Sequence, residues 1–193
     1  MDIPDTQSDS ELARAAQGGS REAFAELTLR HYQPVHSFLI SLLDNRADAE
    51  DLTQDTFLRA LAKIRQFKPG HPFRPWIFTI ARRIAITHWR RRKPTVPLDE
   101  STPHPAAAAP LSQHDAAALW SVARQKLKPD EFSALWFFYR EDLSIKELAK
   151  VLRKTTTHTK VILHRARTHL RDHLEPDTWR PAPAAPAAIQ TMP

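Results

Sequence analysis

The chain has no cysteine and only three glycines among its 193 residues. Without cysteine, a disulfide scaffold, a cysteine nucleophile and a thiolate metal site are excluded. The scarcity of glycine argues against glycine-rich phosphate loops and turn-rich β structure. Charged residues interrupt every apolar stretch well before the roughly 20 residues that a membrane span needs. The first eleven residues are acidic and polar, so we expect no signal peptide, no membrane insertion and a cytoplasmic location.

The 16 prolines are concentrated in two stretches that divide the chain. Residues 94–114 combine prolines with an alanine run and show no apolar periodicity, which is typical of an extended, flexible linker. A second Pro/Ala-rich stretch at 175–193 predicts a disordered tail. Two compact domains are therefore expected, one over residues 8–93 and one over 115–174.

Both domains show apolar residues at helical spacing, and no segment alternates convincingly with a period of two. The sequence therefore predicts an all-α fold of two small helical domains joined by the linker. Capping boxes at Ser8 and Ser144 mark two helix starts. The expected helices run from Ser8 to the glycines at 18–19, from Ser20 to Leu43, from Ala47 to Gln66 and from Pro75 to Arg92, and then over 115–127, 129–139, 144–152 and 157–174.

The last two helices are separated only by Arg153 to Thr156. A short helix, a tight turn and a longer basic helix form the layout of a helix-turn-helix. We expect an inward-facing stripe on the second of these helices, formed by Thr159, Leu163, Ala166 and Leu170.

Positive charge is concentrated at the end of each domain. Residues 66–93 hold eight Lys or Arg and no acid, and residues 143–171 hold eight and one acid, whereas the first 65 residues hold eleven acids and seven bases. A single basic run is usually a solvated helix face. Two such runs, one on a helix-turn-helix and one interleaved with aromatic residues, favour nucleic acid as the partner.

The helix from Pro75 to Arg92 carries arginines and aromatic residues on several faces, although Trp76, Ile77, Ile80, Ala81 and Ile84 form a core stripe. Arginines can contact phosphates and bases, and exposed aromatic rings can stack on unpaired bases. The loop before this helix contains Phe67, His71 and Phe73 and could form a pocket for an extruded base.

Three runs in the chain resemble the small extracytoplasmic-function, or group four, sigma factors of the sigma-70 family. They are DAEDLTQDTFL at 48–58, FRPWIFTIAR at 73–82 and LHRAR at 163–167. The resemblance covers roughly residues 8–174, and its first run is highly specific. It implies a family domain two at 8–93 and a domain four at 115–174.

The resemblance also implies a role for each region. Asp51, Gln54 and Asp55, which share one helix face by their spacing, match the docking site for the clamp of the polymerase β′ subunit. The implied partners are core RNA polymerase, through its β′ clamp and β subunit, promoter DNA and an anti-sigma factor. The implied −10 readers are Phe67, His71, Phe73, Arg82, Arg83, Ile86, Trp89 and Arg90, and the implied −35 readers are Thr157, His158, Lys160, Val161, His164 and Arg165.

The sequence departs from the family pattern at three positions. Arg83 stands where asparagine is common, Arg153 at the usual turn glycine, and Thr159 at a usually aliphatic site. A left-handed Arg153 would cost roughly 1 kcal/mol, so the second helix of the helix-turn-helix could start late or pack loosely.

Nothing in the sequence suggests an enzyme, a cofactor or a metal site. His169 and His173 have an i, i+4 spacing that can bind zinc, but no third ligand is placed near them, and surface histidines are the better interpretation. Two alternatives to a sigma factor remain: a stand-alone helix-turn-helix regulator, and an adaptor that binds only protein. The acidic run at 48–55 and the aromatic, basic loop and helix favour the sigma factor.

Overall fold

The computed structural model describes residues 7–92 and 116–174, and every regular element in these two ranges is helical. This confirms the predicted all-α class; the expected linker at 94–114 and tail at 175–193 lie outside the described residues. The elements in chain order are α1 (Asp9–Gln17), α2 (Arg21–Leu43), α3 (Arg46–Lys63), the 3-10 helix η1 (Ile64–Gln66), α4 (Phe73–Arg92), α5 (Ala116–Lys126), α6 (Pro129–Leu135), the π-helix η2 (Trp136–Arg140), α7 (Ile145–Leu152) and α8 (Thr156–Arg171).

Two helices begin at side-chain caps that the sequence predicts. Both predicted capping boxes are present, at Ser8 with Glu11 and at Ser144 with Glu147. Each pair satisfies backbone N–H groups that a helix start leaves without a partner. Gly19, at a φ of 101°, turns the chain between α1 and α2 in a conformation that favours glycine.

Several helix ends differ from the expected positions. The third helix leaves α geometry at Lys63 and continues as η1, and α6 passes into the π-helix η2 after Leu135. Helix α4 begins at Phe73 rather than Pro75. Hydrophobic periodicity cannot locate these changes, because 3-10 and π turns shift the hydrogen-bond pattern without interrupting the apolar stripe.

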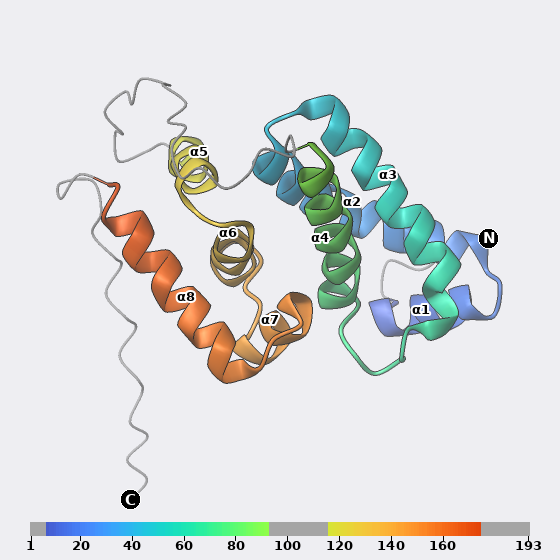
Figure 1. The fold of residues 1–193 in the computed structure, drawn as a ribbon. Helices are drawn as coiled ribbons and strands as arrows, with labels where there is room; N and C mark the ends of the chain where they lie inside the picture. The colour runs from blue at the N-terminus through green and yellow to red at the C-terminus, as the bar shows by residue number, and fades with distance from the viewer. Residues whose placement is uncertain (1–6, 93–115, 175–193) are drawn as a thin grey trace, which may run out of the picture.

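The two halves of the chain, residues 7–92 and 116–174, pack directly on each other along a surface that we call the seam. Helix α7 lies against α4, and α5 lies against α2 (Figure 1). Phe137 inserts between Phe38 and Phe78 of the first half, with ring centroids 4.6 and 4.8 Å away, and all three side chains are completely buried. The apolar core is therefore continuous across the seam.

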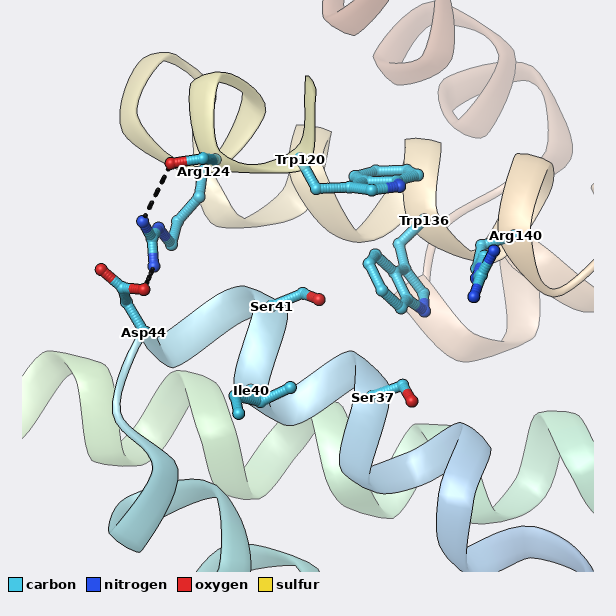
Figure 2. A pocket seen from close by; sticks show the side chains of 9 residues that line it. Ser37, Ile40, Ser41, Asp44, Trp120, Arg124, Trp136 and Arg140 are labelled. Atoms are coloured by element: carbon cyan, nitrogen blue, oxygen red, sulfur yellow. Dashed lines mark hydrogen bonds and ion pairs between the residues drawn. The ribbon is translucent and has the colours of Figure 1, made fainter. Parts of the chain in front are cut away.

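Three ion pairs also cross the seam. They join Arg74 to Glu141, Arg82 to Asp130, and Asp44 to Arg124. The last pair closes one end of a hollow of about 370 Å³ between α2 and the start of the second half (Figure 2). In this hollow, Trp120 and Trp136 lie with ring centroids 4.7 Å apart.

Candidate polymerase-docking and nucleic-acid surfaces

One face of α3 carries acidic, amide and apolar side chains without a covering element among the described residues. Asp51 and Gln54 are exposed, and Asp55 is partly exposed and accepts a hydrogen bond of 2.8 Å from Nε of Arg59. The opposite face of α3 packs inward, as shown by the buried Thr53, Thr56, Phe57 and Ala60. The three predicted docking residues thus share one accessible face.

Leu58 and Leu61 extend this face, and the sequence did not single them out. They stand at helical spacing with Phe57 and Ile64, yet they are 67% and 47% exposed while Phe57 and Ile64 are buried. Leu58 lies one helical turn beyond Gln54 and Asp55, and Leu61 nearly another turn further. We call Asp51, Gln54, Asp55, Leu58 and Leu61 the docking face. Exposed leucines beside acids are a feature of protein-binding surfaces.

Side chains of α1 hold the loop between η1 and α4 through hydrogen bonds to its backbone. Nε2 of Gln17 donates hydrogen bonds to the carbonyls of Ile64 and Phe67, at 2.8 and 2.6 Å, and Oγ of Ser10 accepts one of 3.3 Å from the Gly70 N–H. Gly70 has a φ of 100°, which glycine adopts readily. The loop therefore has a defined shape.

The loop's phenylalanines form its base rather than its exposed edge. Phe67 and Phe73 are 3% and 2% exposed and pack edge to face at 5.5 Å, with Trp76 against both. His71, by contrast, is exposed. Two of the implied −10 readers, Phe67 and Phe73, are therefore buried, and His71 is the member of the loop group that is accessible.

A hollow of about 280 Å³ lies beside this loop, where the sequence predicted a pocket. The first half supplies most of the wall, including Lys68, His71, Trp76 and Thr79. Glu147 and Lys150 of α7 complete it from across the seam. A pocket therefore lies next to the predicted −10 readers, and residues of the second half form part of its wall.

The predicted DNA contacts of α4 divide into two groups. Arg83 and Arg90 are exposed, and Ile86 and Trp89 are half-buried. Arg82 is buried at 8% exposure and pairs with Asp130 of α6. Burial lowers the pKa of the Arg82 guanidinium, and the neighbouring Asp130 carboxylate partly offsets this effect.

Arg82 remains incompletely satisfied. Its Nε is buried and has no hydrogen-bond partner in the described ranges, 7–92 and 116–174. A charged group buried in this way depends strongly on the partner it has. The seam residues Asp130 and Glu141, which hold Arg82 and Arg74, carry no sequence motif, and only the packing of the halves identifies them.

Helices α7 and α8 are joined by a tight turn at Arg153. Arg153 has a φ of 55° and a ψ of 45°, and its N–H caps α7 at the carbonyls of Ala149 and Lys150. Arg153 therefore adopts the left-handed conformation at which a helix often ends, despite the absence of glycine. Thr155 caps α8, so that α8 starts at Thr156 and not late.

The inward stripe of α8 is confirmed: Thr159, Leu163, Ala166 and Leu170 are all buried. The hydroxyl of Thr159 donates a hydrogen bond of 2.9 Å to the Thr155 carbonyl, which satisfies its polar group inside the core. Facing outward are all six predicted −35 readers, Thr157, His158, Lys160, Val161, His164 and Arg165.

Across residues 7–92 and 116–174, no cluster of three or more His, Cys, Asp or Glu side chains is arranged to hold a metal ion. His169 instead contacts Glu131 at 3.3 Å, and His173 lies 2.7 Å from the His169 carbonyl. None of the helices in these ranges is long and apolar enough to cross a membrane.

Comparison with known proteins supports the resemblance seen in the sequence. Residues 27–95 match the family model of sigma-70 region 2. The chain is 33% identical over 165 residues to the RNA polymerase sigma factor CarQ of Myxococcus xanthus, covering 81% of this chain and 91% of CarQ. It is 32% identical over 178 residues to the ECF RNA polymerase sigma factor BldN of Streptomyces coelicolor, covering 84% of this chain and 66% of BldN.

A solved structure shows the same fold. The sigma factor RpoE of Bartonella quintana, crystallised with the anti-sigma factor NepR, superposes with a TM-score of 0.61 at 26% identity, covering 77% of this chain and 94% of that one. The chain belongs to the extracytoplasmic-function, group four, sigma factors of the sigma-70 family, the class of factors that directs transcription initiation by RNA polymerase.

Proposed function

We propose that this sigma factor docks on core RNA polymerase through the docking face of α3, and reads two promoter elements with its two halves. Residues 8–93 act as the domain that docks and reads the −10 element, and residues 115–174 as the domain that reads the −35 element. The observation that carries the proposal is the docking face itself, where acidic residues and two exposed leucines lie together on one helix.

The α7–α8 pair acts as the helix-turn-helix of the −35 reader. A recognition helix presents its N-terminal side chains to base edges in the major groove. The six outward residues of α8 supply hydroxyl, imidazole, ammonium and guanidinium groups for base and phosphate contacts, and Val161 supplies an apolar contact for a thymine methyl group.

The exposed members of the −10 group make the first contacts with the opened strand. Arg83 and Arg90 contact phosphates, and His71 lies at the pocket beside the loop. The half-buried Trp89 is the aromatic residue proposed to stack on a base once the strand is engaged. Phe67 and Phe73 act as positioning residues that hold the loop, which differs from the direct base contact expected from the sequence.

The polymerase performs the chemistry, so the factor needs no catalytic residue, cofactor or metal of its own, and it acts in the cytoplasm. A partner that restrains it is expected, because the related RpoE of Bartonella quintana was crystallised with an anti-sigma factor. The basic faces of the two halves suit an acidic partner surface.

Run-off transcription with purified core polymerase tests the proposal. Template fragments are first selected from genomic DNA by the mixture of core and this chain. A specific transcript should appear only when core, chain and selected template are all present. Transcript from core alone, or no transcript in any mixture, would contradict the proposal. A stand-alone regulator, the remaining alternative, would bind selected duplex tightly without core.

A further inference from the structure

We propose that the hollow of about 370 Å³ between the two halves is a binding site for a small aromatic carboxylate (Figure 2). Its walls come from α2, from α5 and from the π-helix η2. This inference goes beyond the proposed function, because none of the residues that line the hollow belongs to the docking face or to the predicted −10 and −35 readers.

The first argument is the aromatic and apolar wall of the hollow. It includes Trp120 and Trp136, which lie with ring centroids 4.7 Å apart, and Ile40 of α2. Trp136 is buried, whereas Trp120 is partly exposed, so Trp120 offers a ring surface that a flat apolar group can cover. Small-molecule sites typically have volumes of about 300–1,000 Å³ and walls rich in aromatic side chains. The hollow therefore suits a ligand with one small ring system.

The second argument is the backbone of η2, which brings both Trp136 and Arg140 to the hollow. The Glu141 N–H donates a hydrogen bond of 3.3 Å to the Trp136 carbonyl, which is the i to i+5 pattern of a π turn. Within residues 7–92 and 116–174, η2 is the one π-helix. This rare conformation occurs frequently at functional sites, so its place at the wall of a hollow supports a binding role.

The third argument is a set of hydrogen-bond donors that the fold leaves unused. The exposed guanidinium of Arg140 has no ion pair or hydrogen bond with any residue in the described ranges. The hydroxyls of Ser37 and Ser41, one turn apart on α2, also form no hydrogen bond there. A hydroxyl inside a helix can donate to the carbonyl four residues earlier, as Thr28 does to Phe24 in the same helix at 2.9 Å. These three donors on the walls of the hollow are therefore available to a ligand.

The charge of the hollow indicates which kind of ligand fits. At one end, Arg124 is neutralised by its ion pair with Asp44 and donates a hydrogen bond of 3.3 Å to the Ser121 hydroxyl (Figure 2). Arg140 therefore leaves one net positive charge on the walls. A carboxylate carries one negative charge and can accept two parallel hydrogen bonds from a guanidinium, whereas a phosphate monoester carries about 1.5 to 2 negative charges. The balance favours a carboxylate at Arg140 with its ring on Trp120.

Titration of the full chain with benzoate, phenylacetate and indole-3-acetate, followed by the NMR signals of the tryptophan indole N–H groups, tests this inference. The chain has five tryptophans, and Trp120→Phe assigns the signal of Trp120. This signal should shift in a saturable way with at least one of the three acids, with a Kd below about 1 mM for a ligand of this size. The signal of Trp76, which lines the other hollow, should not follow the titration.

Two comparisons test the role of the charge. The amide of the bound acid, which is neutral, and phenyl phosphate should each bind at least about tenfold more weakly than the acid. Arg140→Gln removes the proposed partner of the carboxylate and should weaken binding of the acid by at least about tenfold. Arg14→Gln, which changes an exposed arginine of α1, is the matched control and should bind the acid as the natural chain does. Circular dichroism confirms that both variants keep their helices.

The absence of a saturable shift of the Trp120 signal with all three acids would overturn the inference. Equal binding of the amide or of phenyl phosphate, or undiminished binding by Arg140→Gln, would overturn it as well. The experiment uses neither polymerase nor DNA, so its failure is distinguishable from a failure of the proposed function.

Discussion

Helices α4 and α8 both carry the basic residues assigned to DNA, yet they differ in how well the sequence located their accessible faces. All six residues assigned to α8 are exposed, whereas Phe67, Phe73 and Arg82 of the α4 region are buried. Helix α8 packs on α5, α6 and α7 of its own half, so one apolar stripe defines its inward side. Helix α4 packs on α2 and α3 and also on α7 across the seam. A helix with neighbours on two sides has no single solvent face.

The largest expected effect concerns the docking face of α3, which should bind core polymerase whether or not the seam is intact. Asp51→Lys with Asp55→Lys should abolish core binding, because each lost charge pair at an interface costs about 2–5 kcal/mol. Pull-down with core polymerase measures the loss, and circular dichroism confirms that the helices persist. The control is Glu22→Lys, an exposed acid on α2. Retained binding by the double variant would remove α3 from the account.

The seam itself should contribute strongly to stability. Phe137→Ala leaves a cavity between the halves and should lower the free energy of unfolding by about 3–5 kcal/mol. Denaturant unfolding of the natural and variant chains measures the difference. Tyr139→Ala, which truncates a ring that lies two residues further along the chain and is 49% exposed, is the matched control and should cost much less. Equal effects of the two variants would argue against a tightly packed seam.

The α8 surface should give specific effects on promoter choice. Lys160→Ala or Arg165→Ala should weaken −35 recognition by about 1–3 kcal/mol if the side chain reads a base, with relaxed choice at one position. Loss of a phosphate contact should weaken all sequences alike. Selection from a promoter library with each variant separates these outcomes. The α8 assignment is wrong if neither variant changes affinity or preference.

Binding of single-stranded DNA by α4 should become tighter when the ion pair between Arg82 and Asp130 is removed. Asp130→Asn frees Arg82 and weakens the seam, since a hydrogen bond to a charged group contributes about 1.5–3 kcal/mol. The free chain should then bind a single-stranded −10 oligonucleotide more tightly, while duplex binding through α8 stays constant. Asp172→Asn, at the end of α8, is the control. Fluorescence anisotropy measures both affinities, and an unchanged affinity for the single strand would argue against Arg82 as a contact to the −10 element.

The smallest effect concerns an ion pair inside the first half, between Asp9 of α1 and His31 of α2. A hydrogen bond from His31 holds the pKa of Asp9 below its usual range, with ring nitrogen and carboxylate oxygen 2.7 Å apart. A lowered folded-state pKa contributes stability above the unfolded value, which disappears as the pH falls through the folded value. Asp9→Asn should therefore lower the free energy of unfolding at pH 7 by less than about 1 kcal/mol given solvent screening, and lower the melting temperature accordingly. The two melting temperatures should begin to converge below about pH 4 and meet only below the lowered folded-state pKa of Asp9; a constant difference would contradict this origin.

Local signals in the sequence were sufficient to predict the helices and the inward face of α8. The capping boxes at Ser8 and Ser144 and the stripe from Thr159 to Leu170 all occur where expected. The conformation of Arg153 was left open by the sequence, and the late start considered for the second helix is wrong, because a left-handed Arg153 and the cap at Thr155 let α8 begin at Thr156.

The seam could not be foreseen, because it joins residues with no local relation in sequence. Nothing in the pattern around Asp130 or Glu141 shows that these acids face arginines of α4. The exposure of Leu58 and Leu61 was missed for a related reason. Apolar residues at helical spacing predict a buried stripe, and they give the same pattern when the stripe is kept free for a partner.

The packing of the halves also changes the reason for expecting weak promoter binding by the free chain. The flexible linker predicted at 94–114 would give little gain from two-site binding. The structure adds a second cause, because the packing of the halves holds the two proposed reading surfaces at a fixed spacing and pairs Arg82 with Asp130.

Binding of selected promoter duplex at physiological salt, with and without core polymerase, tests the central claim most directly. The duplexes are those chosen from genomic fragments by the reconstituted mixture, and a scrambled duplex is the control. The account predicts weak, salt-sensitive and non-specific binding by the free chain, and tight, specific binding only when core is present. Tight and specific binding by the isolated chain would contradict it and would identify a stand-alone regulator.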